Sequence, residues 1–357
     1  MNARHAAALA MSVAHRAGIT DPPLSVQVRA ARTVIVFSTH VAFVAHDAAT
    51  KRRMAVERLT LHRLAGRLPV AIPVPVLADG PVCLRTKVVG GSGLLHHEYA
   101  LADRSIGDAY ADDHAALCAA SHTAFSSNEL DALVAAGLPA AAQLDLDDVV
   151  RGAEAMPDRA RALALVEAHR AQVIAPADRT FLHGDVGSHN LVVDGNGRIS
   201  GLFDFEESAA GDRHHEMRWL PSYGDRIVRR VVEVYRARTG VVIDEVRLRR
   251  AHALAALAQY GWVWRAPDEH HRTGRTRTRR ARGRSKRWRA RARWRASDDA
   301  GVRCSVRAVN QRRGSARTLR WPQRSSARPF TAPVGSTRRR STATACRPTR
   351  TVPASAW

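Results

Sequence analysis

Three polar side chains that could serve phosphoryl transfer stand at fixed spacing in residues 181–204, which read FLHGDVGSHNLVVDGNGRISGLFD. Asp185 ends the tripeptide HGD, Asn190 follows five residues later, and Asp204 stands fourteen residues beyond Asn190. Phosphoryl transfer needs the nucleotide phosphates held by Mg²⁺ and an acceptor hydroxyl aligned beside a base. Two carboxylates and an amide meet this need, so the stretch predicts a site for Mg²⁺-dependent phosphoryl transfer.

The chain around these side chains is expected to bring them together. Two short apolar runs, 191–193 and 199–203, flank the turn sequence DGNG, which is a strong signal for a β-hairpin. Such a hairpin would place Asn190 next to Asp204. Mg²⁺ takes few protein oxygens and completes its shell with phosphates and water, which suits one amide and one carboxylate.

Ahead of this stretch, residues 1–93 indicate a small strand-rich unit. The apolar, β-branched runs 33–37 and 41–45 predict a hairpin. Residues 51–65 carry apolar side chains on one helical face, and residues 82–89 predict a further strand before the break GGSG. The Ala-rich start of the chain favours an N-terminal helix over a weak signal peptide.

A longer, mainly helical unit is expected in residues 94–269. Its Ala- and Leu-rich segments predict helices at 111–123, 128–137, 157–172, 225–239 and 244–260. The sequence HHE occurs at 96–98 and at 214–216, but adjacent His side chains on a helix point about 100° apart and suit a Zn²⁺ site poorly. We expect a helix start at 214–216, and Trp219 in the core or the cleft wall.

The net charge of +23 over 357 residues belongs to one segment. Residues 271–357 contain 25 Arg, one Lys and two acids, whereas residues 1–270 carry a net charge of −1. We assign 270–357 to a low-complexity tail with three open interpretations. It is a solvated disordered segment, the product of a reading-frame shift, or an arm that binds nucleic acid by neutralising phosphates.

The cysteines and the hydropathy indicate a compartment. No CxxC pair or metal spacing occurs among the four cysteines, which are Cys83, Cys118, Cys304 and Cys346. Free thiols in a reducing cytoplasm are the plain interpretation. No run of about 18 apolar residues occurs, so we expect no membrane span.

The sequences HGDVGSHN and GLFDFE, followed by the dipeptide GD at 211–212, carry a resemblance to a known family. Over about residues 20–265 the chain resembles the aminoglycoside phosphotransferases, a kinase-like group that includes macrolide, choline and homoserine kinases. The resemblance implies a two-lobed, protein-kinase-like α+β fold. The N-lobe would be a small antiparallel sheet with one helix, and the C-lobe would be mainly helical, with the catalytic hairpin at the cleft.

The resemblance also implies roles for individual residues. Asp185 would be the catalytic base that orients the acceptor hydroxyl, and Asn190 and Asp204 would ligate Mg²⁺. The co-substrate would be ATP or GTP, and the acceptor a hydroxyl of an aminoglycoside-like, macrolide-like or metabolic small molecule. Glu57 would anchor the lysine or arginine that holds the α- and β-phosphates.

The family places the lysine or arginine that Glu57 would anchor on the strand before the Glu57 helix. Matching the predicted hairpin to the family's hairpin puts Val44 near that position, so this strand offers no cation. We therefore assign nucleotide binding to Glu57 together with Lys51, a nearby basic residue. The preceding loop, QVRAAR, has no glycine to let backbone N–H groups approach phosphates closely. Arg29, Arg32 or Lys51 would then have to reach the phosphates from another direction. A rival interpretation is a catalytically impaired, kinase-like module that binds a ligand without transfer.

Overall fold

The computed structural model describes residues 2–90, 92–93, 100–142, 144–265, 289–296 and 302–309. Every element named below belongs to one compact unit. The N-terminal elements are α1 (Ala3–Arg16), β1 (Ser25–Val28), β2 (Arg32–Val36), β3 (His40–Ala45), α2 (Ala48–Leu64), β4 (Pro75–Asp79), β5 (Val82–Thr86) and β6 (Ser92–Gly93).

The remaining elements include several short 3₁₀ helices, labelled η. In chain order they are η2 (Ala100–Ala102), α3 (Arg104–Thr123), α4 (Ser127–Ala135), α5 (Leu146–Glu154), α6 (Arg159–Arg170), η3 (Pro176–Asp178), β7 (Arg179–Leu182), β8 (Leu191–Val193), β9 (Ile199–Leu202), η4 (Phe205–Glu207), β10 (Ala209–Asp212), α7 (Arg213–Glu216), η5 (Leu220–Tyr223), α8 (Asp225–Thr239), α9 (Glu245–Arg265), β11 (Arg289–Ala296) and β12 (Val302–Val309). The mixed α/β architecture confirms the expected fold class.

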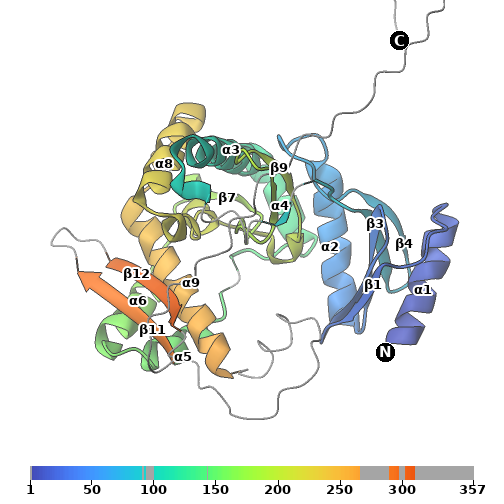
Figure 1. Ribbon diagram of the computed structural model, residues 1–357, viewed down its shortest axis with the longest axis horizontal. Helices are drawn as coiled ribbons and strands as arrows, with labels where there is room; N and C mark the ends of the chain where they lie inside the picture. Colours follow the sequence, from blue (N-terminus) through green and yellow to red (C-terminus); the bar gives the residue numbers. More distant parts are fainter. Residues whose placement is uncertain are drawn as a thin grey trace, which may run out of the picture. The chain divides into compact units, whose positions relative to one another are not determined.

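An antiparallel sheet in the order β1-β2-β3-β5-β4 forms the N-terminal lobe. Because successive strand residues point to opposite faces, each face of the sheet can bury a separate layer. Figure 1 shows α1 on one face and α2 on the other. The apolar face of α1 packs on Ile35 and Val44, and Met54 of α2 packs with Ala45 and Cys83. The expected N-terminal helix, hairpin and second helix are all present.

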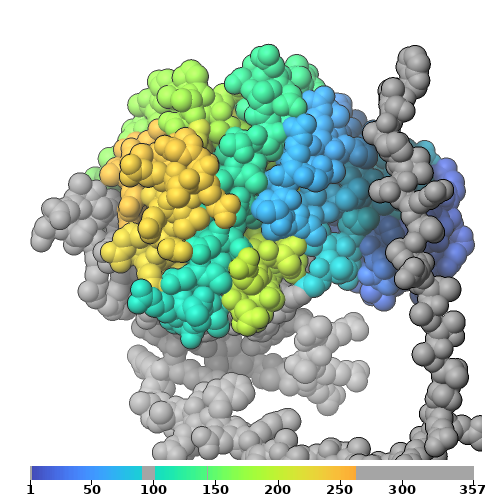
Figure 2. All heavy atoms as spheres, turned by 90° about the horizontal axis from the view of Figure 1, so that it is seen from above, coloured from blue at the N-terminus to red at the C-terminus, as the bar shows by residue number. Residues whose placement is uncertain are grey.

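Helix α2 also belongs to the core of the helical lobe. Asp47 caps its first turn by accepting the N–H of Thr50 at 2.7 Å. At its other end, Leu61 and Leu64 are fully buried among side chains of α3, α4, β7 and α8. Figure 2 shows the blue surface of α2 next to the green surface of the segments that follow it. The position of α2 therefore ties the sheet to the helical lobe.

The helical lobe surrounds two small sheets. Strand β7 pairs with β10, and the hairpin β8–β9 takes up β6 as a third strand. Helices α5, α6 and α9 form a smaller core of their own. The expected helices appear as α3, α4, α6, α8 and α9, whereas α5 had no counterpart in the sequence analysis.

Part of the basic tail falls within the described residues. Strands β11 and β12 form an antiparallel hairpin, and the HHE sequence at 96–98 and the rest of 270–357 lie outside the described residues. The three interpretations of the tail stay predictions. In the described ranges, no helix has the length and apolar character needed to cross a membrane.

Candidate active site

The β8–β9 hairpin brings Asn190 and Asp204 together, as the sequence predicted. Leu191 pairs with Leu202 in the strand register, and the N–H of Phe203 donates to the main-chain oxygen of Asn190 at 3.0 Å. Asp204 follows with a φ of +67°. This left-handed conformation is uncommon outside glycine but tolerated by Asp, and such backbone is typical of functional sites.

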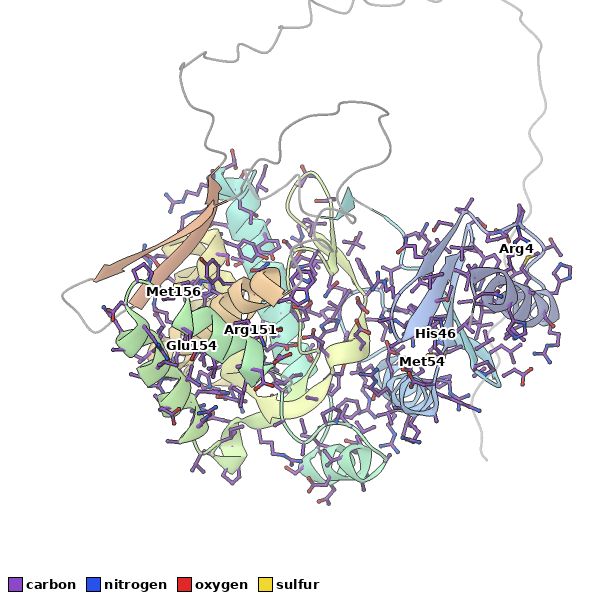
Figure 3. All side chains as sticks on the ribbon, turned by 90° about the horizontal axis from the view of Figure 1, so that it is seen from below. Arg4, His46, Met54, Arg151, Glu154 and Met156 are labelled. Atoms are coloured by element: carbon purple, nitrogen blue, oxygen red, sulfur yellow. The ribbon has the colours of Figure 1, made fainter. Side chains whose placement is uncertain are left out.

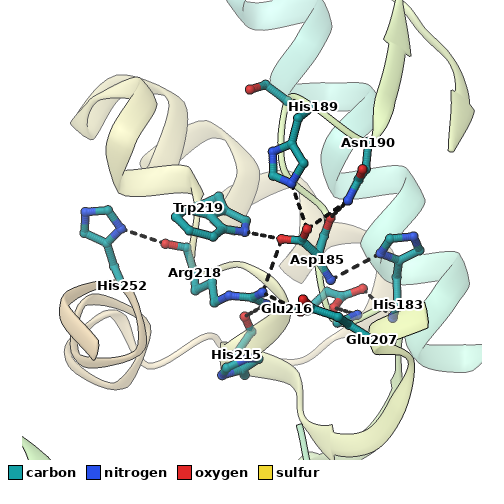
Figure 4. Close-up of polar contacts among 12 residues, drawn as sticks. His183, Asp185, His189, Asn190, Glu207, His215, Glu216, Arg218, Trp219 and His252 are labelled. Carbon is teal, nitrogen blue, oxygen red and sulfur yellow. Dashed lines mark hydrogen bonds and ion pairs between the residues drawn. The ribbon is translucent and has the colours of Figure 1, made fainter. Parts of the chain in front are cut away.

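The carboxylate of Asp185 lies beside this hairpin and accepts hydrogen bonds from four side chains (Figure 4). Its Oδ1 accepts from the indole of Trp219 at 2.7 Å and from Arg218 at 3.2 Å. Its Oδ2 accepts from the ring of His189 at 2.7 Å and from the amide of Asn190 at 2.9 Å. These bonds fix the orientation of the carboxylate.

The same contacts decide the charge of Asp185. Burial by itself would raise its pKa, because desolvation disfavours the charged form. The hydrogen bond and charge of His189, the charge of Arg218 and the bond from Trp219 outweigh burial and lower the pKa to about 2. The carboxylate is therefore ionised at neutral pH, as an acceptor for a hydroxyl proton must be.

A second layer holds the backbone on either side of Asp185. The ring of His183 is fully buried, donates from Nε2 to the Phe203 oxygen at 3.0 Å and accepts the N–H of Asp185 at Nδ1. Burial lowers its pKa to about 4, which keeps the ring neutral. Glu216 accepts the N–H groups of His183 and Gly184 at 2.8 and 2.9 Å. Through these bonds His183 and Glu216 support the backbone of the loop.

The position of Gly184 accepts only glycine. Its φ is +87°, and an added Cβ would lie 2.1 Å from the main-chain oxygen of Glu207. A side chain would collide with that oxygen and strain the backbone, so the loop can approach η4 closely only through glycine.

The donor set fits a Mg²⁺ ion shared with a phosphate ligand. The Nδ2 of Asn190 donates to the main-chain oxygen and Oδ2 of Asp185, which leaves its Oδ1 to face a cation. The side chain of Asp204 is 32% exposed. Among the described residues, no group of three or more His, Cys, Asp or Glu side chains could hold a metal by itself. Hard oxygens in small number are the ligands that Mg²⁺ takes beside phosphates.

On the sheet side, Glu57 is already paired with Arg85 of β5. The two guanidinium Nη atoms of Arg85 donate to the two carboxylate oxygens, at 2.6 Å for the Nη2–Oε2 bond. Lys51 does not join this pair. It is exposed at the start of α2 and, with Asp79, lines a cavity of about 220 Å³ to which neither Glu57 nor Arg85 contributes.

The strand register corrects the position given to Val44. Val44 is fully buried in the cluster against α1, so its side chain points away from α2. The alternate positions of β3 put Phe43 on the face of α2, and Phe43 pairs with Val34 and Cys83. The guanidinium carbons of Arg32 and Arg85 lie 4.8 and 4.5 Å from its ring centre. The strand offers a ring where a cation was expected.

Sequence reasoning missed several of the residues that complete the site. Trp219 was expected only in the core or the cleft wall, and no motif pointed to Arg218 or Arg85. His189 lies inside HGDVGSHN at a position that the spacing leaves unspecified. The helix start at 214–216 is confirmed, since α7 begins there with Asp212 as its cap, and this helix delivers the Glu216 carboxylate.

Comparisons with known proteins identify the family and the fold. The model of the phosphotransferase enzyme family matches residues 30–252. The GDP complex of wild-type aminoglycoside 2′-phosphotransferase-IIIa is 18% identical, with a TM-score of 0.56, and the match covers 76% of this chain and 94% of that one. The macrolide 2′-phosphotransferase MphH from Brachybacterium faecium is 19% identical, with a TM-score of 0.53 and coverages of 74% and 95%.

A third solved structure is the streptomycin–ATP ternary complex of APH(2″)-IIa. It is 16% identical, with a TM-score of 0.53, and the match covers 75% of this chain and 95% of that one. At such low identity these structures establish the fold alone. No curated protein matches the chain.

Proposed function

Because the chain belongs to the phosphotransferase enzyme family, we propose that it transfers the γ-phosphate of ATP or GTP to a hydroxyl of a small molecule. The observation that carries the proposal is the convergence of Asp185, Asn190 and Asp204 at one end of the β8–β9 hairpin. Each has the chemistry that its role requires, and the hydrogen bonds described above hold Asp185 and Asn190 in fixed orientations.

In the proposed reaction, Asp185 accepts the proton of the acceptor hydroxyl. The hydroxyl oxygen bonds to the γ-phosphorus, and the bond between that phosphorus and the bridging oxygen breaks to release ADP or GDP. Oδ2 already accepts from His189 and Asn190, so the hydroxyl has to take the place of one donor. His189 is the more exposed of the two, with 48% of its side chain accessible.

Mg²⁺ would be held by Oδ1 of Asn190 and the carboxylate of Asp204. When bound, it neutralises charge on the transferring phosphate and the leaving nucleotide. Related solved structures are complexes with GDP or ATP, which supports a purine nucleoside triphosphate as phosphate donor. Asp185 itself stays free of the metal in this assignment and is available to the hydroxyl.

The acceptor class is proposed from the same neighbours. Structures with this fold include complexes with kanamycin, gentamicin and streptomycin, and macrolide 2′-phosphotransferases. We propose an acceptor rich in hydroxyl groups, with aminoglycosides and macrolides as the first compounds to assay and choline and homoserine as the next.

The test combines binding with turnover. Unaltered protein is titrated with MgATP and MgGTP by calorimetry, beside the variants Asp204→Ala and Asp147→Ala. Asp147 is an exposed acid on α5 and serves as the matched control. We expect Asp204→Ala to lose most of the affinity while Asp147→Ala keeps it. Equal binding by unaltered protein and Asp204→Ala would overturn the kinase assignment, and turnover on the acceptor panel then identifies the substrate.

A binding module without transfer is the second candidate, and one contact favours it. Arg32 lies 3.4 Å from Oδ1 of Asp204 and 2.7 Å from Glu206, so a cation of the chain already neutralises the proposed metal site. A thermal shift with MgATP, but no phosphorylated product from any acceptor in a single-turnover assay, would support this candidate.

Two further proposals come from the sequence. We propose a reducing cytoplasm as the compartment, since Cys83 and Cys118 are free and buried.

Nucleic-acid binding through 271–357 is tested by a salt-dependent DNA-binding assay with and without that segment. Affinity that persists after its removal would contradict the assignment to the tail.

A further inference from the structure

We propose that Arg32 of β2 is the side chain that holds the nucleotide's phosphates, and that Arg85 of β5 serves only to lock Glu57 in place. The inference rests on the proposed function and deepens it, since it assigns the phosphate grip that strand β3 lacks. The ligand class is a nucleoside triphosphate with its divalent cation.

The first argument is that Arg85 has no solvent-exposed donor to offer to a ligand. Its side chain is 2% exposed and that of Glu57 is 6% exposed. Both terminal nitrogens of the guanidinium are paired with the Glu57 carboxylate, and its Nε is buried without a hydrogen-bond partner among the described residues, out of reach of solvent. A buried charge that loses its partner is strongly destabilising. Arg85 is thus committed to Glu57 and keeps α2 against the sheet whether or not a nucleotide is bound.

The second argument is the direction of Arg32. This residue pairs with Ala45 in the register of β2 and β3, which places it on the same face of the sheet as Phe43 and Arg85. Its guanidinium reaches across to Asp204 and Glu206. Among the described residues, it is the sheet arginine that contacts the proposed metal turn.

The third argument concerns charge. Two carboxylates lie beside the Arg32 guanidinium, that of Asp204 at 3.4 Å and that of Glu206, whose side chain is 47% exposed, at 2.7 Å. A triphosphate carried by Mg²⁺ on Asp204 would bring further negative charge to the same place. Phosphate oxygens match the guanidinium fork of Arg32 and would replace Glu206 as its partner.

The fourth argument is the turn between β1 and β2, which lacks the glycines that let a backbone cradle phosphates. His46, which is labelled on the sheet in Figure 3, contacts this turn. Its N–H donates to the Ala31 oxygen at 3.0 Å, and its ring contacts the Ala30 oxygen at 3.2 Å and the Thr33 hydroxyl at 2.9 Å. Arg32, a cation at the base of this turn, would bind the phosphates that a glycine-rich backbone would otherwise bind.

The experiment measures MgATP and adenosine binding by calorimetry on the full chain, for unaltered protein, Arg32→Met, Arg32→Lys and Arg29→Met. Arg29 is exposed in the same turn and controls for loss of one positive charge. We expect Arg32→Met to weaken MgATP binding by roughly 10- to 100-fold, the effect of one or two charged hydrogen bonds. Arg32→Lys should recover part of the lost MgATP affinity. Arg29→Met should change MgATP affinity by less than about threefold. None of the three substitutions should affect adenosine binding.

A second pair of variants tests whether Arg85 contributes to phosphate binding. Arg85→Met should lower the thermal unfolding midpoint because Glu57 stays buried without a partner. Arg85→Met combined with Glu57→Met should regain much of that midpoint and bind MgATP within about threefold of unaltered protein.

Three outcomes would overturn the inference. They are unchanged MgATP binding in Arg32→Met, an equal loss in Arg29→Met, and loss of MgATP binding in the stable double variant. If unaltered protein binds no MgATP at all, the proposed function fails together with the inference. That result is distinct from the three above, in which unaltered protein binds.

Discussion

Asp185 and Arg32 approach the Asp204 turn from two lobes, and their surroundings have different origins. Asp185 is held by donors from a single stretch, residues 189–219. Arg32 and Arg85 come from strands separated by a helix and meet through the ring of Phe43. A loop that carries its own donors depends on one local sequence. A cation on the sheet can come from any strand that directs a side chain to the same face, so its position is not tied to one local sequence.

The largest effect is expected on the loop side, from Asp185→Asn. The amide cannot take the hydroxyl proton, so we expect the turnover rate to fall by about 10³-fold, within the range for a general base. The measurement is single-turnover phosphoryl transfer to the best acceptor. MgATP affinity should stay within about threefold of unaltered protein, and a comparable loss of affinity would show that Asp185 serves binding instead of chemistry.

The next prediction tests the sheet side through Val44→Lys. Val44 is fully buried against α1, so the lysine charge would have to enter an apolar layer. We expect the free energy of unfolding to fall by at least about 3 kcal/mol, with no gain in MgATP affinity. Val26→Lys, at an exposed position of β1, should cost less than about 1 kcal/mol. Tighter nucleotide binding by Val44→Lys would restore Val44 as the cation position.

Gly184→Ala probes how closely the loop is packed. The added Cβ would lie 2.1 Å from the Glu207 oxygen at a φ of +87°, so we expect roughly 2–4 kcal/mol of destabilisation in urea unfolding. Gly195→Ala is the matched change in the β8–β9 turn, where an added Cβ meets nothing within 4 Å. If the two variants were equally stable, the loop would be looser than its contacts indicate.

Glu216→Gln gives the loop side a pH signature. Burial raises the pKa of Glu216 to about 7, and the backbone bonds and Arg218 only partly offset this. Between the ordinary Glu pKa and pH 7 the folded state binds more protons than the unfolded state, so stability falls as pH rises through this window. Glutamine does not titrate. From pH 5 to pH 8 the free energy of unfolding of the variant should rise by roughly 1–3 kcal/mol relative to that of unaltered protein. If the difference in unfolding free energy between the two proteins did not depend on pH, the raised pKa of Glu216 would be contradicted.

The smallest effect is expected for Trp219→Phe. The change removes the indole N–H that donates to Asp185 at 2.7 Å and keeps an aromatic ring. Loss of one hydrogen bond to a charged group should lower the turnover rate by roughly 10-fold, with little change in the unfolding midpoint. A rate equal to that of unaltered protein would mean that Arg218 alone suffices to orient Oδ1.

The parts of the fold that could be predicted are those with a local signal. The turn DGNG between two apolar runs predicted the β8–β9 hairpin, and the hairpin predicted that Asn190 would lie beside Asp204. Helix α5 was missed because it is only nine residues long and its buried side chains pack mainly on the distant helix α9.

The cation on the sheet could not be predicted from the same signals. Matching two apolar runs to a hairpin does not say which face each residue takes, and a shift of one residue moves every side chain to the other face. Val44 was therefore assigned in place of Phe43. Arg85 lies on a strand with no motif around it, and it is recognised only once the register puts it beside Glu57.

The sequence by itself predicted that Asn190 and Asp204 would lie together, because spacing along the chain controls which side chains a tight hairpin brings together. It also predicted most of the helices and strands, since apolar periodicity follows secondary structure. The tertiary structure alone decided that Trp219 and Arg218 hold Asp185, that Arg85 pairs with Glu57, and that Arg32 reaches the Asp204 turn. Such contacts join segments far apart in the chain, and their energies depend on burial and register, which exist only after folding.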